Sequence, residues 1–150
     1  MTGQDGSSDR IVVGVDGSPS AREALRWAIR QAELTSGSVD AVIAWQYPVA
    51  YGAYGMAPVS VTNEADFAGW AGRMLAGEVA AVTGPDDSAP VRQQVIEGNP
   101  ARTLLAAAEG ADLLVVGCRG HGGFAEALLG SVGQHCVHHA HCPVVVIRAR

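Results

Sequence analysis

The chain has 150 residues and a mass of 15.4 kDa, a size typical of one compact domain. Hydrophobic residues make up 48% and charged residues 17%, a globular composition that excludes a disordered chain. The formal net charge is -5 and all ten basic residues are arginines, which argues against a nucleic-acid or anionic-membrane binder and excludes mechanisms that need lysine.

The N-terminus is polar and without periodicity, so we predict a disordered tail at residues 1–9 and one domain at residues 10–150. The tail has no apolar core of a signal peptide, and no apolar run nears the roughly 20 residues that span a bilayer. The cysteines Cys118, Cys136 and Cys142 lack the spacing of a disulfide framework. We therefore expect a cytoplasmic protein with reduced thiols and no membrane partner.

The first strand is predicted at residues 11–15, a short apolar run. Ser18 is a good N-cap and Pro19 a good first residue for the amphipathic helix that follows. That helix ends before Gly37, and residues 39–45 predict a second apolar strand.

A loop rich in Tyr, Gly and Pro is expected at residues 46–60, and a helix at residues 62–82 despite three interior glycines. Residues 91–97 form a more polar strand, which suggests an edge of the sheet. Asn99 is the predicted N-cap of a third helix at residues 101–109, with Pro100 at the N1 position.

Residues 112–117 are a second strongly apolar strand. A glycine-rich loop follows at residues 118–130, then a short helix at 131–139 and a last apolar strand at 143–148.

This alternation predicts an α/β fold, a single-domain doubly wound five-stranded parallel sheet with right-handed crossovers. The first and fourth strands are the most apolar and belong in the centre, which gives the strand order 3-2-1-4-5. That order creates a topological switch point beyond the C-terminal ends of strands one and four, where open α/β sheets bind ligands.

The loop at this switch point has glycines at both ends. Gly117 and Gly120 leave amides uncovered where the chain turns off the fourth strand, and Gly130-Ser131 opens the last helix. Amide clusters and a helix N-terminus can hold a di- or triphosphate without lysine, and the Ser131 hydroxyl can bind phosphate or its metal. The alternative is a flexible turn with Ser131 as a cap.

The spacing G-x2-G-x9-G-[ST] resembles the ATP-binding motif of the universal stress protein family. The resemblance covers most of the chain and is densest at residues 13–18, 117–123 and 142–146. It implies the adenine nucleotide alpha-hydrolase-like fold, ATP with Mg²⁺ or Mn²⁺ in the crevice, and a homodimer through the C-terminal strand.

The resemblance also assigns nucleotide-contacting positions along the crevice. They are Gly14, Val15 and Asp16 after the first strand, Trp45 after the second, Gly117, Gly120, His121, Gly122 and Gly123 in the first half of the loop, and Gly130, Ser131 and Val132 in the second. Arg119 is the only basic residue of the loop and is included in the predicted site. Cys118 stands where serine is common, and we expect the Glu126 carboxylate to face solvent, away from phosphate.

Several of these features have plainer interpretations. Asp16 can serve only the turn, His121 can be a solvated loop residue, and the Tyr/Gly segment at residues 47–58 is either a lid over the nucleotide or a surface loop. The His and Cys residues at positions 135–142 resemble a metal site, but histidines suit the end of a helix and thiols pack as small apolar groups, so no zinc site is expected.

The sequence therefore predicts an ATP-binding regulatory protein of the stress response with an unknown partner protein. Binding of cyclic AMP or another adenine nucleotide is the open alternative. An enzyme, a slow ATPase or a phosphoryl transferase, is disfavoured because lysine and an evident base are lacking, and an interaction module with an empty pocket is disfavoured by the intact loop.

Overall fold

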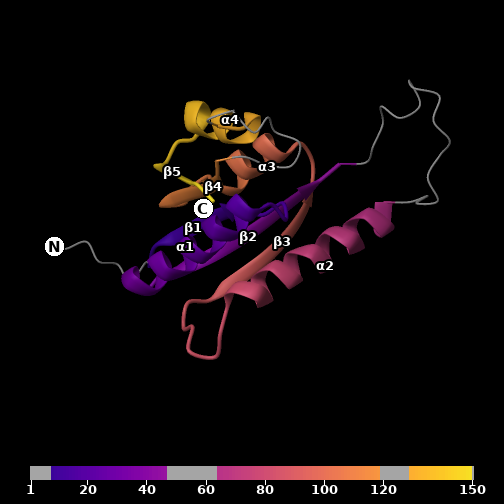
Figure 1. The fold of residues 1–150 in the computed structure, drawn as a ribbon. Coiled ribbons are helices and arrows are strands. Elements are labelled where there is room, and N and C mark those ends of the chain that lie inside the picture. The colour runs from indigo at the N-terminus through magenta and orange to yellow at the C-terminus, as the bar shows by residue number, and fades with distance from the viewer. Residues whose placement is uncertain (1–7, 47–63, 119–128, 150) are drawn as a thin grey trace, which may run out of the picture.

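The structure is a computed structural model that describes residues 8–46, 64–118 and 129–149 (Figure 1). Its strands are β1 (Arg10–Gly14), β2 (Ser38–Trp45), β3 (Val91–Glu97), β4 (Leu113–Gly117) and β5 (Val144–Ile147). Its helices are α1 (Pro19–Thr35), α2 (Glu64–Val82), α3 (Pro100–Ala107) and α4 (Ser131–His139). Each predicted element is present within the described residues, with ends that shift by one or two positions.

The five strands form one parallel sheet in the order β3-β2-β1-β4-β5. The predicted fold class and strand order are confirmed. β1 pairs with β2 on one side and with β4 on the other. Strands β2 and β3 are therefore added on one side of β1, and β4 and β5 on the other, which places the predicted switch point between β1 and β4.

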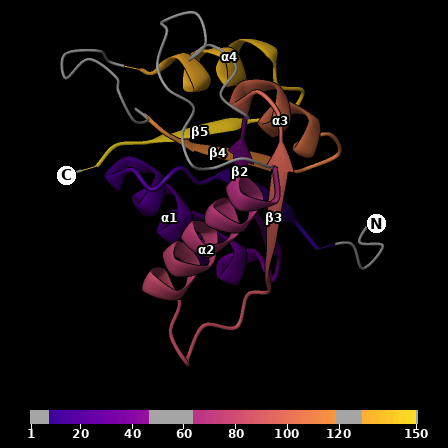
Figure 2. The same cartoon turned by 90° about the vertical axis from the view of Figure 1, so that its right-hand side faces the viewer.

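Helices cover both faces of the sheet. Figure 2 shows α1 and α2 on one face and α3 and α4 on the other. Successive side chains of β1 alternate between the two cores: Ile11 and Val13 pack toward α1 and α2, and Val12 packs toward α3 and α4. The central strands are therefore buried on both faces, as their apolar sequences predict.

The predicted helix signals act as expected at α1 and α3. The Ser18 side chain accepts a hydrogen bond from the Ala21 amide at 3.3 Å, and Asn99 accepts from Arg102 at 3.1 Å. Both α1 and α3 have a proline in their first turn. Ser36 ends α1 in the left-handed conformation, with φ of 56°.

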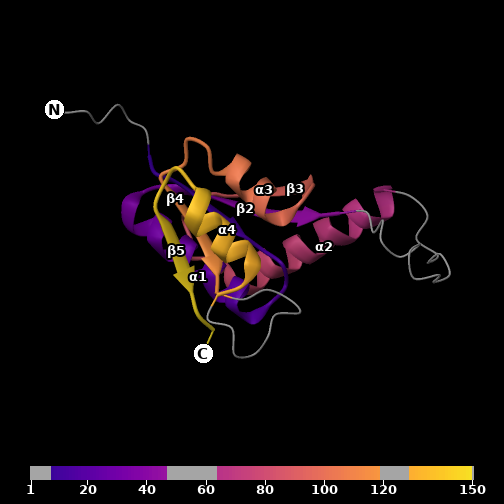
Figure 3. The same cartoon turned by 90° about the horizontal axis from the view of Figure 1, so that it is seen from above.

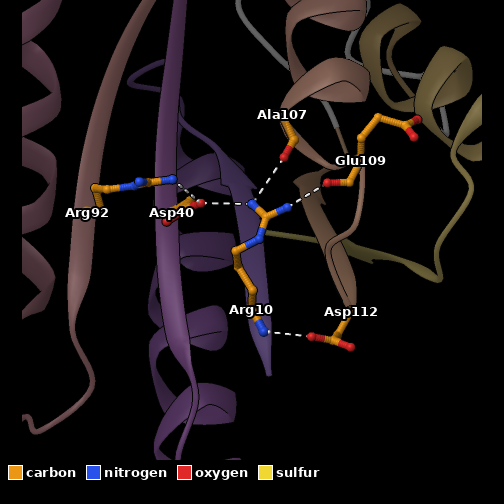
Figure 4. A network of polar contacts seen from close by, with 6 residues as sticks. All are labelled: Arg10, Asp40, Arg92, Ala107, Glu109 and Asp112. Atoms are coloured by element: carbon orange, nitrogen blue, oxygen red, sulfur yellow. Dashed lines mark hydrogen bonds and ion pairs between the residues drawn. The ribbon is translucent and has the colours of Figure 1, made fainter. Parts of the chain in front are cut away.

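A polar network lies at the N-terminal end of the sheet, opposite the switch point (Figure 4). Asp40 on β2 is buried and accepts from Arg10 at 2.9 Å and from Arg92 at 3.0 Å. The Arg10 guanidinium also donates to the carbonyl oxygens of Ala107 and Glu109 at the end of α3. These bonds satisfy a buried carboxylate and the last carbonyls of a helix together.

Within the described parts of the chain, no helix is long and apolar enough to cross a membrane.

Candidate functional site

The turn after β1 begins at the switch point. The backbone amide of Ser18 donates to Oδ1 of Asp16 at 2.8 Å, and Gly17 has a φ of 83°. Asp16 therefore holds the turn, as its plainer interpretation proposed, with one of its two carboxylate oxygens. Its side chain is half-buried at the C-terminal end of β1.

Gly14 and Val15 were expected along the wall of the crevice, and both are fixed by packing. A Cβ atom on Gly14 would lie 2.7 Å from Cδ1 of Leu104 on α3. The Val15 side chain is buried in the core under α1, and its amide donates to the carbonyl of Val42 at 2.8 Å. Neither residue directs a side chain toward a ligand, so any contact from them uses the backbone.

Gly117 ends β4 where the first turn of α1 passes very close. A Cβ atom there would lie 2.5 Å from Oγ of Ser20 and 2.8 Å from the backbone nitrogen of Ala21. Packing between β4 and α1 therefore requires this glycine, independently of any phosphate. The role of Gly117 in the phosphate loop stays a prediction.

The two ends of the glycine-rich loop are tied together. The Cys118 amide donates to the carbonyl of Ile147 at 2.8 Å, and the Cys118 carbonyl accepts from the Gly130 amide at 2.7 Å. The Gly130 amide, expected among the phosphate donors, is thus already used. Residues 119–128 lie outside the described residues, and with them the predicted contacts of Arg119, Gly120, His121, Gly122 and Gly123 and the orientation of Glu126. The Tyr/Gly segment at 47–58 also lies outside.

The N-terminus of α4 differs from those of α1 and α3. Its N-cap is Gly130, which offers no side-chain hydrogen bond, and its first residue is Ser131 rather than proline. The first-turn amides of a helix have no partner within the helix, so Ser131 and Val132 keep N–H groups that can bind an anion at the positive end of the helix dipole. Ser131 is exposed, and its hydroxyl lies at the same end.

Trp45 is the last residue of β2. Its carbonyl oxygen accepts from the Gly98 amide at 2.8 Å, and its ring stacks on Phe67 of α2 with centroids 6.3 Å apart and planes 3° apart. Figure 3 shows β2 and α2 extending together on one side of the molecule, with β4 and β5 on the other. An adenine contact with the Trp45 carbonyl would use its second lone pair.

Arg22, in the first turn of α1, is paired with a carboxylate and so is not a free cation. Its guanidinium binds both carboxylate oxygens of Glu78 on α2, at 3.0 and 2.6 Å. The hydrogen bond from Arg22 lowers the pKa of Glu78, against the opposing effect of burial. This pair anchors α2 to the helix that starts at the switch point.

The cysteine and histidine set at positions 135–142 is spread between core and surface. Cys136 is buried, and burial raises the pKa of its thiol to about 11. His135, His138 and His139 are exposed on α4, and His141 lies 3.1 Å from a carboxylate oxygen of Glu109. In the part of the chain that the structure describes, no group of three or more His, Cys, Asp or Glu side chains could hold a metal ion.

Sequence reasoning missed the partners that hold these elements in place. Asp40 inside an apolar strand was a readable signal, because a buried carboxylate requires a cation or several donors. Leu104 opposite Gly14 and Ser20 opposite Gly117 had no such signal, since both contacts join distant segments.

A model of the universal stress protein family matches residues 7–148. Universal stress protein Rv2623 of Mycobacterium tuberculosis is 36% identical over 149 residues, which cover 94% of this chain and 48% of the relative. The chain thus spans about half the length of these curated relatives.

Two solved structures share the fold. One is a universal stress protein in complex with cAMP, with a TM-score of 0.66, 22% identity and coverage of 96% of this chain and 99% of that one. The other is the universal stress protein from Archaeoglobus fulgidus in complex with dAMP, with a TM-score of 0.56, 21% identity and coverage of 93% and 97%.

Proposed function

This chain belongs to the universal stress protein family, and we propose that it is an ATP-binding regulatory protein of the stress response. The nucleotide lies at the switch point between β1 and β4, with its phosphates on α4. Nucleotide occupancy then changes the contacts that the protein makes with a regulatory partner.

The observation that carries this proposal is the N-terminus of α4. Among the helix starts given above, α1 and α3 have a side-chain cap and a proline, whereas α4 has neither and begins at the switch point. Gly117, Gly120, Gly130 and Ser131 have the spacing of the family's ATP-binding motif around this start. A phosphate bound there is stabilised by free amides and by the helix dipole, without any lysine.

The adenine end of the crevice is supported by two residues on its other side. The second carboxylate oxygen of Asp16 lies at the β1–α1 turn, where a carboxylate can accept from a ribose hydroxyl. Trp45 and its stacked partner Phe67 give an apolar wall at the end of β2. Two relatives of the same fold were solved with cAMP and dAMP, which supports an adenine nucleotide as the ligand.

Mg²⁺ or Mn²⁺ accompanies the nucleotide in this proposal. No group of three or more metal-binding side chains exists within the described residues, so most ligands of the ion are phosphate oxygens and water. The exposed Ser131 hydroxyl is the side chain of α4 best placed to add a ligand.

We further propose that the protein is a homodimer in the cytoplasm. β5 is the edge strand next to β4 and consists of Val and Ile only, so its open edge can pair with a second copy. The three cysteines are free thiols, which suits a reducing compartment.

The alternative ligand is cyclic AMP or another adenine nucleotide, favoured by the ligand of one structural relative. Calorimetry with Mg·ATP and with cyclic AMP, on protein freed of nucleotide, separates the two. We expect tighter binding of Mg·ATP and its loss in Gly120→Val, because a side chain there blocks the close approach of phosphate to the backbone. Equal ATP affinity in Gly120→Val overturns the site, and tighter cyclic AMP binding overturns the ligand.

A further inference from the structure

The C-terminal half of α4 presents three exposed histidines, His135, His138 and His139. His135 and His139 are separated by one helical turn, so their side chains leave the helix on the same face. His138 follows His135 by three positions and is adjacent to His139, so it borders the same face. The three residues therefore provide one pair at a four-residue spacing and one neighbour beside that pair.

The rings of His135 and His139 already lie close together. Their centroids are 5.6 Å apart, and their planes are inclined by 41°. The centroids of His138 and His139 are 6.4 Å apart, with an inclination of 60°. Two imidazole nitrogens that share a metal ion each lie roughly 2.0–2.1 Å from it. Because both rings are exposed, small side-chain rotations bring the pair to that geometry.

We propose that His135 and His139 form a surface site for a divalent transition-metal ion of the Zn²⁺, Cu²⁺ and Ni²⁺ class. Imidazole nitrogen is a ligand that these ions prefer, whereas Mg²⁺ and Ca²⁺ prefer oxygen. Two histidines spaced by four positions on one helical face also hold Zn²⁺ in the HExxH motif of metalloproteases. His139 lies in the last turn of α4, where the negative end of the helix dipole favours a bound cation.

The protein supplies two ligands and leaves the other positions to water. No third His, Cys, Asp or Glu completes a metal-binding group within the described residues. The nearby candidates are already engaged, since Cys136 is buried and His141 contacts Glu109. The site is therefore open and exchangeable, unlike the closed tetrahedral zinc site that the sequence argued against.

This site is separate from the proposed nucleotide site. Ser131 and His139 mark opposite ends of α4, about 12 Å apart at 1.5 Å per residue. Metal binding at the histidine pair can thus be measured in nucleotide-free protein, and its success or failure does not depend on ATP binding.

Calorimetric titration of nucleotide-free protein with Zn²⁺, as zinc chloride, tests the proposal. We expect one Zn²⁺ per chain and a loss of affinity of at least tenfold in His135→Gln and in His139→Gln. His138→Gln is the matched control on the same helix and should bind within twofold of the wild type. All three residues are exposed, so circular dichroism should show the same melting for each variant.

The proposal is overturned by either of two results. One is the absence of saturable binding near one Zn²⁺ per chain in the wild type. The other is a loss in His138→Gln equal to that in His135→Gln, which would show that Zn²⁺ binds histidines without using the paired geometry.

Discussion

The amide nitrogen of Gly130 donates to the carbonyl oxygen of Cys118 at 2.7 Å, so the residue before α4 is fixed beside the end of β4. The Cys118 amide in turn bonds to Ile147 on β5. The N-terminus of α4 is therefore held at the switch point by the sheet itself, whatever the loop between residues 118 and 130 does. The proposed binding of phosphate at this helix start would therefore cost little conformational entropy.

Gly117→Ala tests the close contact between β4 and α1. The added Cβ atom would lie 2.5 Å from Oγ of Ser20 and within 3 Å of the α1 backbone, so the first turn of α1 must shift. We expect the free energy of unfolding to fall by about 1–3 kcal/mol, as for other overpacked cores. Urea denaturation measures this loss.

Gly77→Ala is the matched control, because it adds the same methyl group where nothing lies within 4 Å. Gly77 is exposed inside α2, so alanine should raise stability by about 0.5–1 kcal/mol. If the two variants have the same free energy of unfolding, the conclusion that β4 and α1 pack too closely for a side chain at position 117 is wrong.

Sequence patterns were sufficient for the fold because they are local. The apolar runs of β1 and β4 and the Ser18-Pro19 and Asn99-Pro100 starts specify strands and helices from a few adjacent residues. Strand order then followed from polarity, since the polar β3 belongs at an edge.

The geometry of the candidate site was harder to predict from the sequence, because it depends on contacts between segments that are distant in the chain. Nothing near Gly130 in the sequence shows that its amide bonds to Cys118, or that Arg22 is paired with Glu78 on another helix. The absence of a cap on α4 could be read from Gly130-Ser131, but its importance appears only beside the capped α1 and α3.

Glu78→Gln tests the ion pair that anchors α2 to α1. The pKa of Glu78 is lowered in the folded protein, from 4.5, chiefly by the hydrogen bond from Arg22. The pair therefore contributes its full stability above about pH 4.5 and loses it as the pH falls through the folded-state pKa. We expect the variant to be less stable than the wild type by about 1 kcal/mol at pH 7, with the difference shrinking toward pH 3.

Urea denaturation at pH 7, 5 and 3 measures this difference. Glu23→Gln serves as the control, because Glu23 pairs with Arg26 on the exposed side of α1 and should change stability by less than about 0.5 kcal/mol. A difference for Glu78→Gln that stays constant between pH 7 and pH 3 would exclude the ion pair as its cause.

Val146→Pro tests dimerisation through β5. The carbonyls of Pro143 and Ile147 accept hydrogen bonds from β4, so by alternation the amides of Val144 and Val146 point to the open edge. Proline at position 146 removes an edge amide while leaving the ladder to β4 intact. Sedimentation should show a wild-type dimer and a variant close to the 15.4 kDa of one chain. Wild-type protein that sediments only as a monomer at micromolar concentration contradicts the prediction.

Hydrolysis of ATP should be slow. Phosphoryl transfer needs an oriented nucleophile and a cation on the developing charge, yet the chain has no lysine and Arg22 is bound to Glu78. Free amides are expected to bind the phosphates equally well in the ground state and in the transition state. Such uniform binding does not accelerate the chemical step. Single-turnover assays with labelled ATP should give rates far below the roughly 10 per second typical of enzymes. Release at several per second, lost in Arg119→Ala or Glu126→Gln, would instead identify an enzyme.

The binding of phosphate to the first-turn amides of α4 is the central claim, and a pair of variants at one position tests it most directly. Ser131→Ala removes only the hydroxyl, whereas Ser131→Pro removes the hydroxyl and the amide donor. Proline is well tolerated as the first residue of a helix, as in α1 and α3, and Gly130 has the extended backbone that precedes proline, with φ of −73° and ψ of 170°.

Calorimetry with Mg·ATP on both variants is the decisive measurement, with thermal melting to show that both are folded. We predict that Ser131→Pro weakens ATP binding at least tenfold beyond Ser131→Ala, because a charge-assisted hydrogen bond is lost. Equal ATP affinity in the two folded variants would contradict the account, since it would show that the free amide at the start of α4 does not hold the phosphate.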